Sequence, residues 1–192
     1  MMSGLFVSDA ATRLRASVVA IVDNSRRGGH GAGIAWTAGD LFVTSAHVVS
    51  KKQTIVVTSD GRAVDGTVVA RDAKRDIAVV QAPQARVPVV SWRDPRALRP
   101  GSFVFAVGHP MGVRDAVSIG VLQAVRALPE GYGLNGTGSL AWVQADIRLA
   151  PGNSGGPIAD VEGNVIGVSA MIVSGLALAV PAPDVEQLLS SL

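Results

Sequence analysis

A single serine stands inside a glycine-rich run, where its hydroxyl could act as a nucleophile. Residues 150–158 read Ala-Pro-Gly-Asn-Ser-Gly-Gly-Pro-Ile, which places Ser154 among three glycines and an asparagine. Glycine and asparagine adopt left-handed backbone at low cost, so this loop can turn sharply and direct N–H groups at one point. Acyl transfer needs such donors beside a nucleophile, because they hold the oxygen that becomes negative. The alternative is that the run is only a tight turn before a strand.

A serine nucleophile needs a general base, and His47 is the best placed of the three histidines. It follows the apolar residues 41–44, and the end of a rigid strand positions a side chain well enough for proton transfer. His30 lies in a glycine-rich stretch, and His109 precedes a proline in a predicted turn. The alternative for His47 is a hydrogen-bonded histidine of the core.

Asp76 is the candidate for orienting that histidine. It directly precedes the apolar residues 77–80, and a carboxylate at the edge of a buried strand is costly unless it is paired. A histidine N–H would satisfy it, and pairing with Arg71, Arg75 or a backbone amide is an equal alternative from the sequence. Four other aspartates stand in predicted turns, namely Asp60, Asp65, Asp94 and Asp115.

The candidate residues occur in the order histidine, aspartate, serine, at positions 47, 76 and 154. Serine proteases of the chymotrypsin class have the same order, with the aspartate holding the histidine that takes the serine's proton. His47 and Asp76 lie in the first half of the chain and Ser154 in the second. A shared site would therefore lie in the cleft between the two halves.

Composition narrows both the fold and the function. Of the 192 residues 48% are hydrophobic but only 4% aromatic, and there are 22 glycines and 10 prolines. This composition favours many short strands joined by turns. The formal net charge of +2 is too small to indicate a nucleic-acid partner. With no cysteine, no histidine pair at ligand spacing and no phosphate loop, we expect no disulfide, metal or cofactor.

Short apolar segments separated by turn residues recur along the whole chain. Strands are predicted over residues 17–22, 33–36, 41–45, 54–58, 64–70 and 77–81, and then over 102–108, 116–127, 141–145, 155–160, 165–170 and 176–180. Residues 87–100 read as a crossover between the halves, and the glycine-rich residues 128–139 as a loop.

Two sets of six strands predict an all-β fold of two packed antiparallel six-stranded barrels. We expect one domain over residues 1–192, with the first barrel at about 17–86 and the second at about 101–181. Short helices are predicted at both ends, over residues 8–15, capped by Ser8, and over about 182–191.

Eight segments, spread over about residues 17–189, carry a resemblance to one known family. They are residues 31–34 (GAGI), 43–49 (VTSAHVV), 75–80 (RDIAVV), 107–112 (VGHPMG), 144–146 (QAD), 151–157 (PGNSGGP), 163–167 (GNVIG) and 178–181 (LAVP). Taken together, they make the chain similar to the protease domain of the HtrA (Deg) family, a trypsin-like branch of the serine endopeptidases.

The resemblance implies a chymotrypsin-like fold and a serine endopeptidase that cleaves unfolded or misfolded polypeptides. Ser154 is then the nucleophile, His47 the base, and Asp76 the residue that holds the imidazole tautomer. The oxyanion hole is expected at Gly152, Asn153 and Ser154, with the N–H groups of Gly152 and Ser154 as donors.

The pocket for the substrate side chain just before the cut is also implied by the resemblance. Its expected residues are Leu149, Ser169, Ala170, Met171 and Ala177. None is acidic, so a substrate lysine or arginine would lose its water without gaining a partner. The family usually has glycine where Ala177 stands, and the added methyl group should narrow the pocket. We therefore expect valine, alanine and leucine there, rather than basic or large aromatic residues.

Expectations for partners and compartment rest mainly on the same resemblance. We expect polypeptide substrates, no nucleic acid, no membrane segment and a possible homo-oligomer, because family members form trimers through residues near the N-terminus. Leu5 and Phe6 could serve this purpose. No signal peptide is recognised, so the expected compartment is the cytoplasm, unless the sequence is a trimmed piece of an exported protein. The sequence shows no match to the PDZ domain that commonly follows the terminal helix in this family.

Two other functions are compatible with the sequence. The first is a non-catalytic, chaperone-like polypeptide-binding module, against which the complete set His47, Asp76 and Ser154 argues. The second is a protease that rests inactive, with the Gly152 peptide turned away until a partner orders the loops. The glycine-rich residues 128–139 make this second alternative reasonable.

Overall fold

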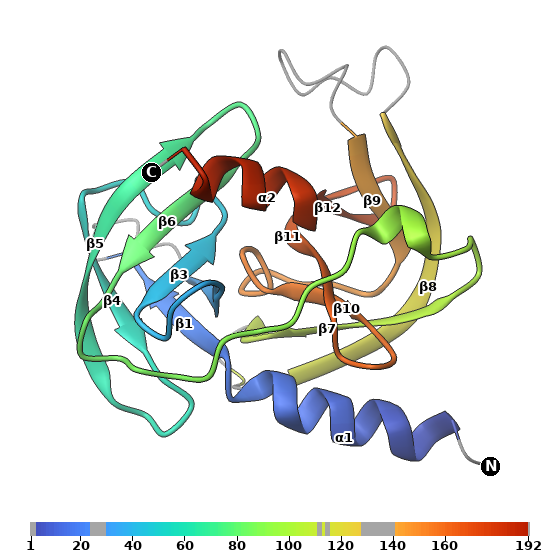
Figure 1. The fold of residues 1–192 in the computed structure, drawn as a ribbon, viewed down its shortest axis with the longest axis horizontal. Helices are drawn as coiled ribbons and strands as arrows, with labels where there is room; N and C mark the ends of the chain where they lie inside the picture. Colours follow the sequence, from blue (N-terminus) through green and yellow to red (C-terminus); the bar gives the residue numbers. More distant parts are fainter. Residues whose placement is uncertain (1–2, 24–29, 111–112, 114–115, 128–140, 192) are drawn as a thin grey trace.

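Two β-barrels pack side by side, with one helix near each end of the chain (Figure 1). The computed structural model describes residues 3–23, 30–110, 113, 116–127 and 141–191, without the side chains of residues 3–6. The first barrel contains β1 (Val18–Val22), β2 (His30–Ala35), β3 (Leu41–Thr44), β4 (Gln53–Val57), β5 (Ala63–Asp72) and β6 (Ile77–Gln81). The second contains β7 (Phe103–Gly108), β8 (Ala116–Ala127), β9 (Ala141–Asp146), β10 (Pro157–Asp160), β11 (Val165–Val173) and β12 (Leu176–Pro181). The helices are α1 (Ser3–Arg15), the 3-10 turn η1 (Pro95–Ala97) and α2 (Ala182–Leu189).

Each barrel is a closed antiparallel sheet, in the order β1-β2-β3-β6-β5-β4 for the first and β10-β11-β12-β9-β8-β7 for the second. The prediction of two antiparallel six-stranded barrels is confirmed. Strand β6 illustrates the packing, because Ala78 and Val80 lie in the core of the first barrel whereas Ile77 packs in the seam between barrels. Burial on both faces explains why this strand reads as a continuous apolar run rather than an alternating one.

A separate cluster of buried side chains lies in the seam between the barrels and includes residues of both helices. Helix α1 contributes its apolar positions at helical spacing, namely Val7, Ala10, Ala11 and Leu14. Helix α2 contributes Ala182 and Val185, which pack with residues of both barrels. In Figure 1, α1 runs along one side of the molecule beside β7, and α2 crosses the front between the barrels. The helices therefore cover the seam that holds the two barrels together.

Many element boundaries differ from the sequence-based prediction, by one to five residues. Helix α1 begins at Ser3, so Ser8 lies inside it, where its carbonyl oxygen accepts a bond from the Thr12 hydroxyl at 2.8 Å. Strand β2 begins at His30 rather than at residue 33, because His30 pairs with Val22 of β1. Strand β10 begins at Pro157, after two glycines that form a turn. The predicted loop 128–139 lies wholly outside the described residues.

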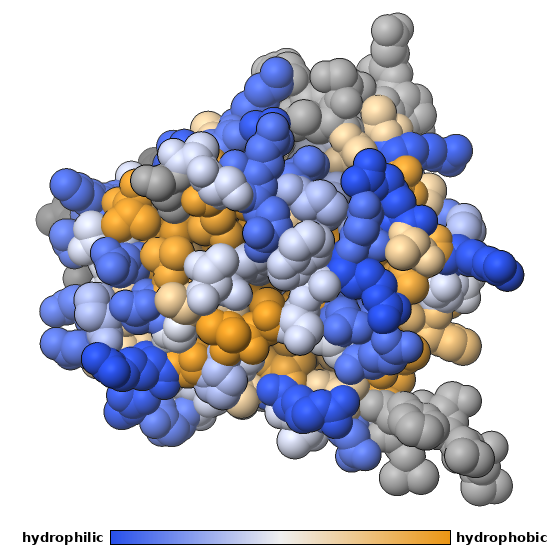
Figure 2. Space-filling model, viewed as in Figure 1, coloured by the Kyte–Doolittle hydropathy of each residue, from blue (hydrophilic) through white to orange (hydrophobic). Residues whose placement is uncertain are grey.

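The surface is mostly hydrophilic on the face drawn in Figure 2, with hydrophobic areas visible between the polar residues. Two large apolar side chains are among the most exposed, Phe103 at 60% and Ile119 at 58%, on the paired strands β7 and β8. Among the described helices, none combines the length and the apolar character needed to cross a bilayer.

Candidate active site

His47 and Asp76 are joined by two hydrogen bonds at one end of the first barrel. His47 follows β3 and Asp76 directly precedes β6, and these two strands are paired. His47 Nδ1 lies 2.7 Å from Asp76 Oδ2, and the His47 backbone N–H donates to Oδ1 at 2.9 Å. The N–H of Ala46 donates to the carbonyl oxygen of Asp76 at 3.1 Å. The aspartate thus holds both the backbone and the ring of the histidine.

The backbone of Asp76 lies in the left-handed region, with φ of 57°, which aspartate tolerates better than most residues. Its carboxylate accepts from the imidazole and from a backbone amide, not from the neighbouring arginines. Arg71 donates to the carbonyl oxygen of Ala46 at 3.2 and 3.3 Å, and Arg75 pairs with Asp72 at 2.8 Å. Of the pairings compatible with the sequence, the structure therefore contains the histidine and the amide.

The same bond fixes which ring nitrogen can act as a base. An ionised carboxylate only accepts hydrogen bonds, so Nδ1 of His47 carries the proton that it shares with Asp76. Nε2 of a neutral ring is then left to take up a proton. The His47 side chain is 51% exposed and that of Asp76 only 16%. A substrate can reach the histidine, whereas its carboxylate partner is shielded.

Ser154 follows a tight turn over residues 150–153, closed by the Asn153 N–H donating to the Ala150 carbonyl oxygen at 3.0 Å. Gly152 has φ of 105°, and a Cβ at this position would lie 2.3 Å from the carbonyl oxygen of His109. Both the backbone conformation and the close contact require glycine. The His109 N–H donates in return to the Gly152 carbonyl oxygen at 3.2 Å. The turn is therefore fixed against the segment after β7.

The serine loop rests directly on β2 of the first barrel. The carbonyl oxygen of Ser154 accepts a bond from the Ala32 N–H at 2.8 Å. Gly155, with φ of 83°, lies so close that a Cβ there would be 2.2 Å from the Ala32 carbonyl oxygen. This contact and the positive φ end the turn and place Pro157 at the start of β10.

One carbonyl group links the serine loop to the histidine segment. The carbonyl oxygen of Ser169 accepts from the Gly155 N–H at 2.7 Å and from the Ser45 hydroxyl at 2.9 Å. Ser45 lies two residues before His47, and Gly155 directly follows Ser154. The nucleophile and base candidates are thus carried by segments bonded to the same atom. Within the described part of the chain, no hydrogen bond joins the Ser154 hydroxyl to His47, and such bonds are often long in ligand-free enzymes.

Two backbone donors beside the serine are unbonded. Among the described residues, neither the N–H of Gly152 nor that of Ser154 donates a hydrogen bond. The N–H of Asn153, between them, is used in the turn and is not available to a ligand. Two free N–H groups next to a hydroxyl are what stabilisation of an acyl oxyanion requires.

A pocket of about 240 Å³ opens beside Ser154. Its lining residues carry no charge and are Leu149, Ala150, Pro151, Asn153, Ser154, Ser169, Ala170, Met171 and Ile172. Four of the five residues expected for the substrate pocket lie here. The fifth, Ala177 of β12, does not line this pocket. It is fully buried in the core of the second barrel and pairs with Ile172 of β11. Its methyl group is therefore not part of the pocket wall.

Sequence reasoning missed the groups that support the site. Ser45 and the carbonyl of Ser169 join the two segments, and Arg71 holds the peptide before His47. Their roles depend on backbone atoms, which the sequence does not identify. The nearness of Ser45 to the histidine was the one available signal. Among the residues that the structure describes, no group of three His, Cys, Asp or Glu side chains could hold a metal ion.

Comparison with known proteins places this chain in a family. Residues 31–168 match the family model described as a trypsin-like peptidase domain. The serine protease HTRA1 of Xenopus tropicalis is 31% identical over 163 residues, which cover 83% of this chain and 35% of that protein. The serine protease HTRA3 of Mus musculus is 32% identical over 169 residues, covering 83% of this chain and 37% of that protein. The chain thus spans little more than a third of the length of these relatives.

Solved structures agree with the sequence relatives. The HtrA-type protease AlgW, solved with a tripeptide, superposes with a TM-score of 0.88 and 26% identity. The superposition covers 96% of this chain and 62% of that one. The two paired barrels, the sequence matches and the structural neighbour agree: the chain belongs to the trypsin-like peptidase family, and these relatives are HtrA-type proteases.

Proposed function

We propose that the chain is a serine endopeptidase in which Ser154 is the nucleophile, His47 the general base and Asp76 the orienting carboxylate. The observation that carries this proposal is the 2.7 Å contact between His47 and Asp76. The serine loop and the segment before His47 both donate to the carbonyl oxygen of Ser169, which brings them to one place. The unbonded N–H groups of Gly152 and Ser154 supply the oxyanion donors.

In the acylation step, Ser154 Oγ attacks the carbonyl carbon of the scissile peptide bond while its proton passes to His47 Nε2. The carbonyl oxygen becomes negative and accepts hydrogen bonds from the two free N–H groups. Asp76 stabilises the imidazolium ion, which then gives its proton to the departing amine nitrogen. An ester between the acyl group and Ser154 Oγ remains.

In the deacylation step, water takes the place of the amine. His47 Nε2 removes a proton from water as the oxygen attacks the ester carbon, and the same donors hold the second oxyanion. The proton returns from His47 to Ser154 Oγ when the acyl bond breaks. The carboxylic acid product leaves, and the enzyme is restored.

Unfolded or misfolded polypeptides are the proposed substrates, with aliphatic residues before the cut. The uncharged lining of the 240 Å³ pocket supports this preference, because a buried substrate cation would find no counter-charge. AlgW was solved with a tripeptide, which supports a peptide as the bound substrate.

Hydrolysis of an unfolded, fluorescently labelled protein by the parent chain and by Ser154→Ala tests the proposal. We expect cleavage by the parent and a loss of several orders of magnitude in the variant, with unchanged circular dichroism. Residual cleavage within about tenfold of the parent would rule out Ser154 as the nucleophile. Tight binding of the substrate without cleavage by the parent would favour the chaperone-like alternative.

The turn over residues 150–153 favours a protease that is competent without an activator. The positive φ of Gly152 and the Asn153–Ala150 bond fit a type II turn, and in this state the Gly152 N–H is unbonded. Steady cleavage by the purified chain, with no lag and no added partner, is the expected result. Activity that appears only after a peptide activator is added would support a resting inactive state instead.

The homo-oligomer also stays a proposal. An apolar groove of about 360 Å³ lies between α1 and strands β7 and β8, next to the exposed Phe103 and Ile119. The side chains of Leu5 and Phe6 lie outside the described residues. Light scattering of the parent chain and of Phe103→Asp tests self-association, which the variant should weaken. A monomeric parent would exclude it.

A further inference from the structure

The turn that carries Asp76 is held by a second carboxylate. Asp72, the last residue of β5, accepts the backbone N–H groups of Lys74 at 2.9 Å and Arg75 at 3.0 Å through Oδ1. Its Oδ2 accepts the Arg75 guanidinium at 2.8 Å. Burial, the largest single influence, acts to raise the pKa of Asp72, but these hydrogen bonds together lower it. The Asp72 carboxylate therefore holds the turn over residues 72–75 through two backbone bonds and one side-chain bond.

The same guanidinium reaches a distant element. Arg75 Nη2 donates to Gln187 Oε1 of α2 at 3.3 Å, across 112 positions of sequence. Asp184, in the first turn of α2, also lies within the electrostatic influence of Arg75. One side chain thus connects the turn before β6 to the C-terminal helix.

Helix α2 is itself fixed to both barrels. Val185 packs in the seam cluster that also contains Ile77, the residue after Asp76. The Trp36 indole N–H, beyond the end of β2, donates to the carboxylate of Glu186. Figure 1 shows the helix crossing in front of the seam between the barrels. Helix α2 is therefore well fixed in place and can hold the Arg75 side chain that is bonded to it.

We propose that Arg75 is a positioning residue for the His47–Asp76 pair, because it ties the turn that carries Asp76 to helix α2. The inference rests on the proposed function of that pair. Asp76 keeps a positive φ of 57°, a conformation that persists only where its surroundings over-determine it. Without the Arg75 side chain, the turn would lose its bond to Gln187 of α2 and the guanidinium bond to Asp72. The carboxylate would then hold the imidazole less precisely.

The expected effect falls on kcat rather than on KM. The pocket is lined by residues 149–151, 153, 154 and 169–172, which belong to the other barrel, and Arg75 is not part of the lining. Small displacements of catalytic groups are costly to the chemical step, by up to about a hundredfold for 1 Å. For Arg75→Ala we expect a fall in kcat of about tenfold, with KM changed by less than about twofold.

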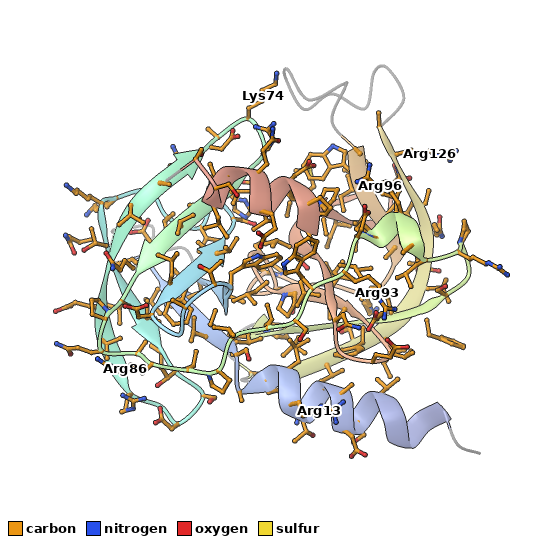
Figure 3. All side chains as sticks on the ribbon, viewed as in Figure 1. Arg13, Lys74, Arg86, Arg93, Arg96 and Arg126 are labelled. Atoms are coloured by element: carbon orange, nitrogen blue, oxygen red, sulfur yellow. The ribbon has the colours of Figure 1, made fainter. Side chains whose placement is uncertain are left out.

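Four single-residue variants test this on the full chain. Arg75→Ala removes both the bond to Gln187 and the side-chain bond to Asp72. Gln187→Ala changes an exposed residue of α2 and removes only the bond between Arg75 and Gln187. Lys74→Ala is the matched control, because it removes the same charge from the same turn. The Lys74 side chain projects away from the molecule (Figure 3) and bonds to no other described side chain. We expect kcat to fall most in Arg75→Ala, less in Gln187→Ala, and not in Lys74→Ala. Arg75→Lys should recover part of the loss.

Proton NMR separates positioning from general destabilisation. The His47 Nδ1–H, bonded to a carboxylate, should give a low-field resonance that His47→Ala lacks. It should broaden or shift upfield in Arg75→Ala and remain in Lys74→Ala. The double variant Arg75→Ala/Gln187→Ala should lose no more activity than Arg75→Ala alone, because both remove one connection.

The inference is overturned if Arg75→Ala and Gln187→Ala keep the parental kcat and the low-field resonance. If Arg75→Ala does not fold, Gln187→Ala decides alone. If the parent does not hydrolyse peptides at all, the proposed function fails, but the resonance still reports whether Arg75 positions the pair. An equal fall of kcat in Lys74→Ala would mean that charge, and not the link, is responsible.

Discussion

The two barrels contribute to the site in opposite ways. The first provides a histidine and an aspartate whose polar atoms are bonded to each other, with Asp76 also accepting from two neighbouring N–H groups. The second provides a serine loop in which two N–H groups are left without an acceptor among the described residues. In the first barrel the hydrogen bonds that orient the imidazole are present, whereas in the second the two N–H groups are available to a ligand.

This difference reflects what each half must do during the reaction. A general base has to keep one orientation, so its partners are present before the substrate binds. An oxyanion hole has to receive charge that does not yet exist, so its donors must be aimed and unbonded. The carbonyl oxygen of Ser169 accepts from Gly155 and from Ser45, so it connects the serine loop to the segment that carries His47.

The largest effect on kcat should come from disrupting the His47–Asp76 pair of the first barrel. Asp76→Asn keeps the shape of the side chain, but its NH₂ group can donate to the imidazole and favour the other tautomer. We expect kcat to fall by roughly 10⁴-fold, with a small change in stability. Kinetics on a peptide substrate, with thermal unfolding as a control for folding, check this. A loss below about tenfold would mean that Asp76 does not set the tautomer.

The next largest effect on kcat should come from moving the free Gly152 N–H of the serine loop. Gly152→Ala introduces a Cβ that would lie 2.3 Å from the His109 carbonyl oxygen, so the turn must move its N–H away from the oxyanion position. We expect kcat to fall by about 10²- to 10³-fold. Gly101→Ala is the control, because Gly101 has a similar φ of 88° but nothing within 4 Å of the added Cβ. Equal losses in both variants would indicate backbone strain alone.

A smaller effect concerns the pocket of the second barrel. In a peptide-library digest read by mass spectrometry, we expect valine, alanine and leucine before the cut to exceed lysine, arginine and large aromatic residues. Leu149→Ala should widen tolerance toward larger side chains, by about 1–3 kcal/mol for each methylene accommodated. Ala177→Gly, outside the lining, should leave the preference unchanged. Dominant cleavage after arginine or lysine would contradict the pocket assignment.

The smallest effect concerns Asp184, at the start of the helix that joins the two halves. Burial raises its pKa, against the opposing charges of Arg75 and Arg96. A raised pKa in the folded state means that its contribution to stability is present at low pH and lost as pH rises through that pKa. Asp184→Asn should therefore increase the free energy of unfolding at neutral pH, by less than about 1 kcal/mol for this partly exposed group. Urea unfolding at pH 7 checks the sign, and a decrease would contradict it.

The arrangement of barrels and the candidate residues could be predicted because they depend on local patterns. Short apolar runs and turn residues define the strands, and the PGNSGGP segment needs its glycines for the positive φ at residues 152 and 155. The position of Ala177 could not be predicted, because β11 has a register shift between Ser169 and Met171. Such a bulge changes which residues of the neighbouring strand face the pocket.

Long-range side-chain contacts were equally hidden from the sequence. Nothing local to Arg75 indicates that it prefers Asp72 and Gln187 to its neighbour Asp76, because the choice depends on where α2 lies. The start of α1 at Ser3 was missed because a serine inside a helix looks like a cap from the sequence alone. These features follow from tertiary packing, which overrides local preference.

The central claim is that His47, held by Asp76, activates Ser154, and covalent labelling with a fluorophosphonate tests it most directly. We predict a single adduct on Ser154 in the parent chain, found by mass spectrometry of the digested protein. The rate of labelling should rise with pH through the range in which imidazole loses its proton, and His47→Ala should react at least about a hundredfold more slowly. An adduct on another residue, or equal labelling of the parent and His47→Ala, would contradict the account.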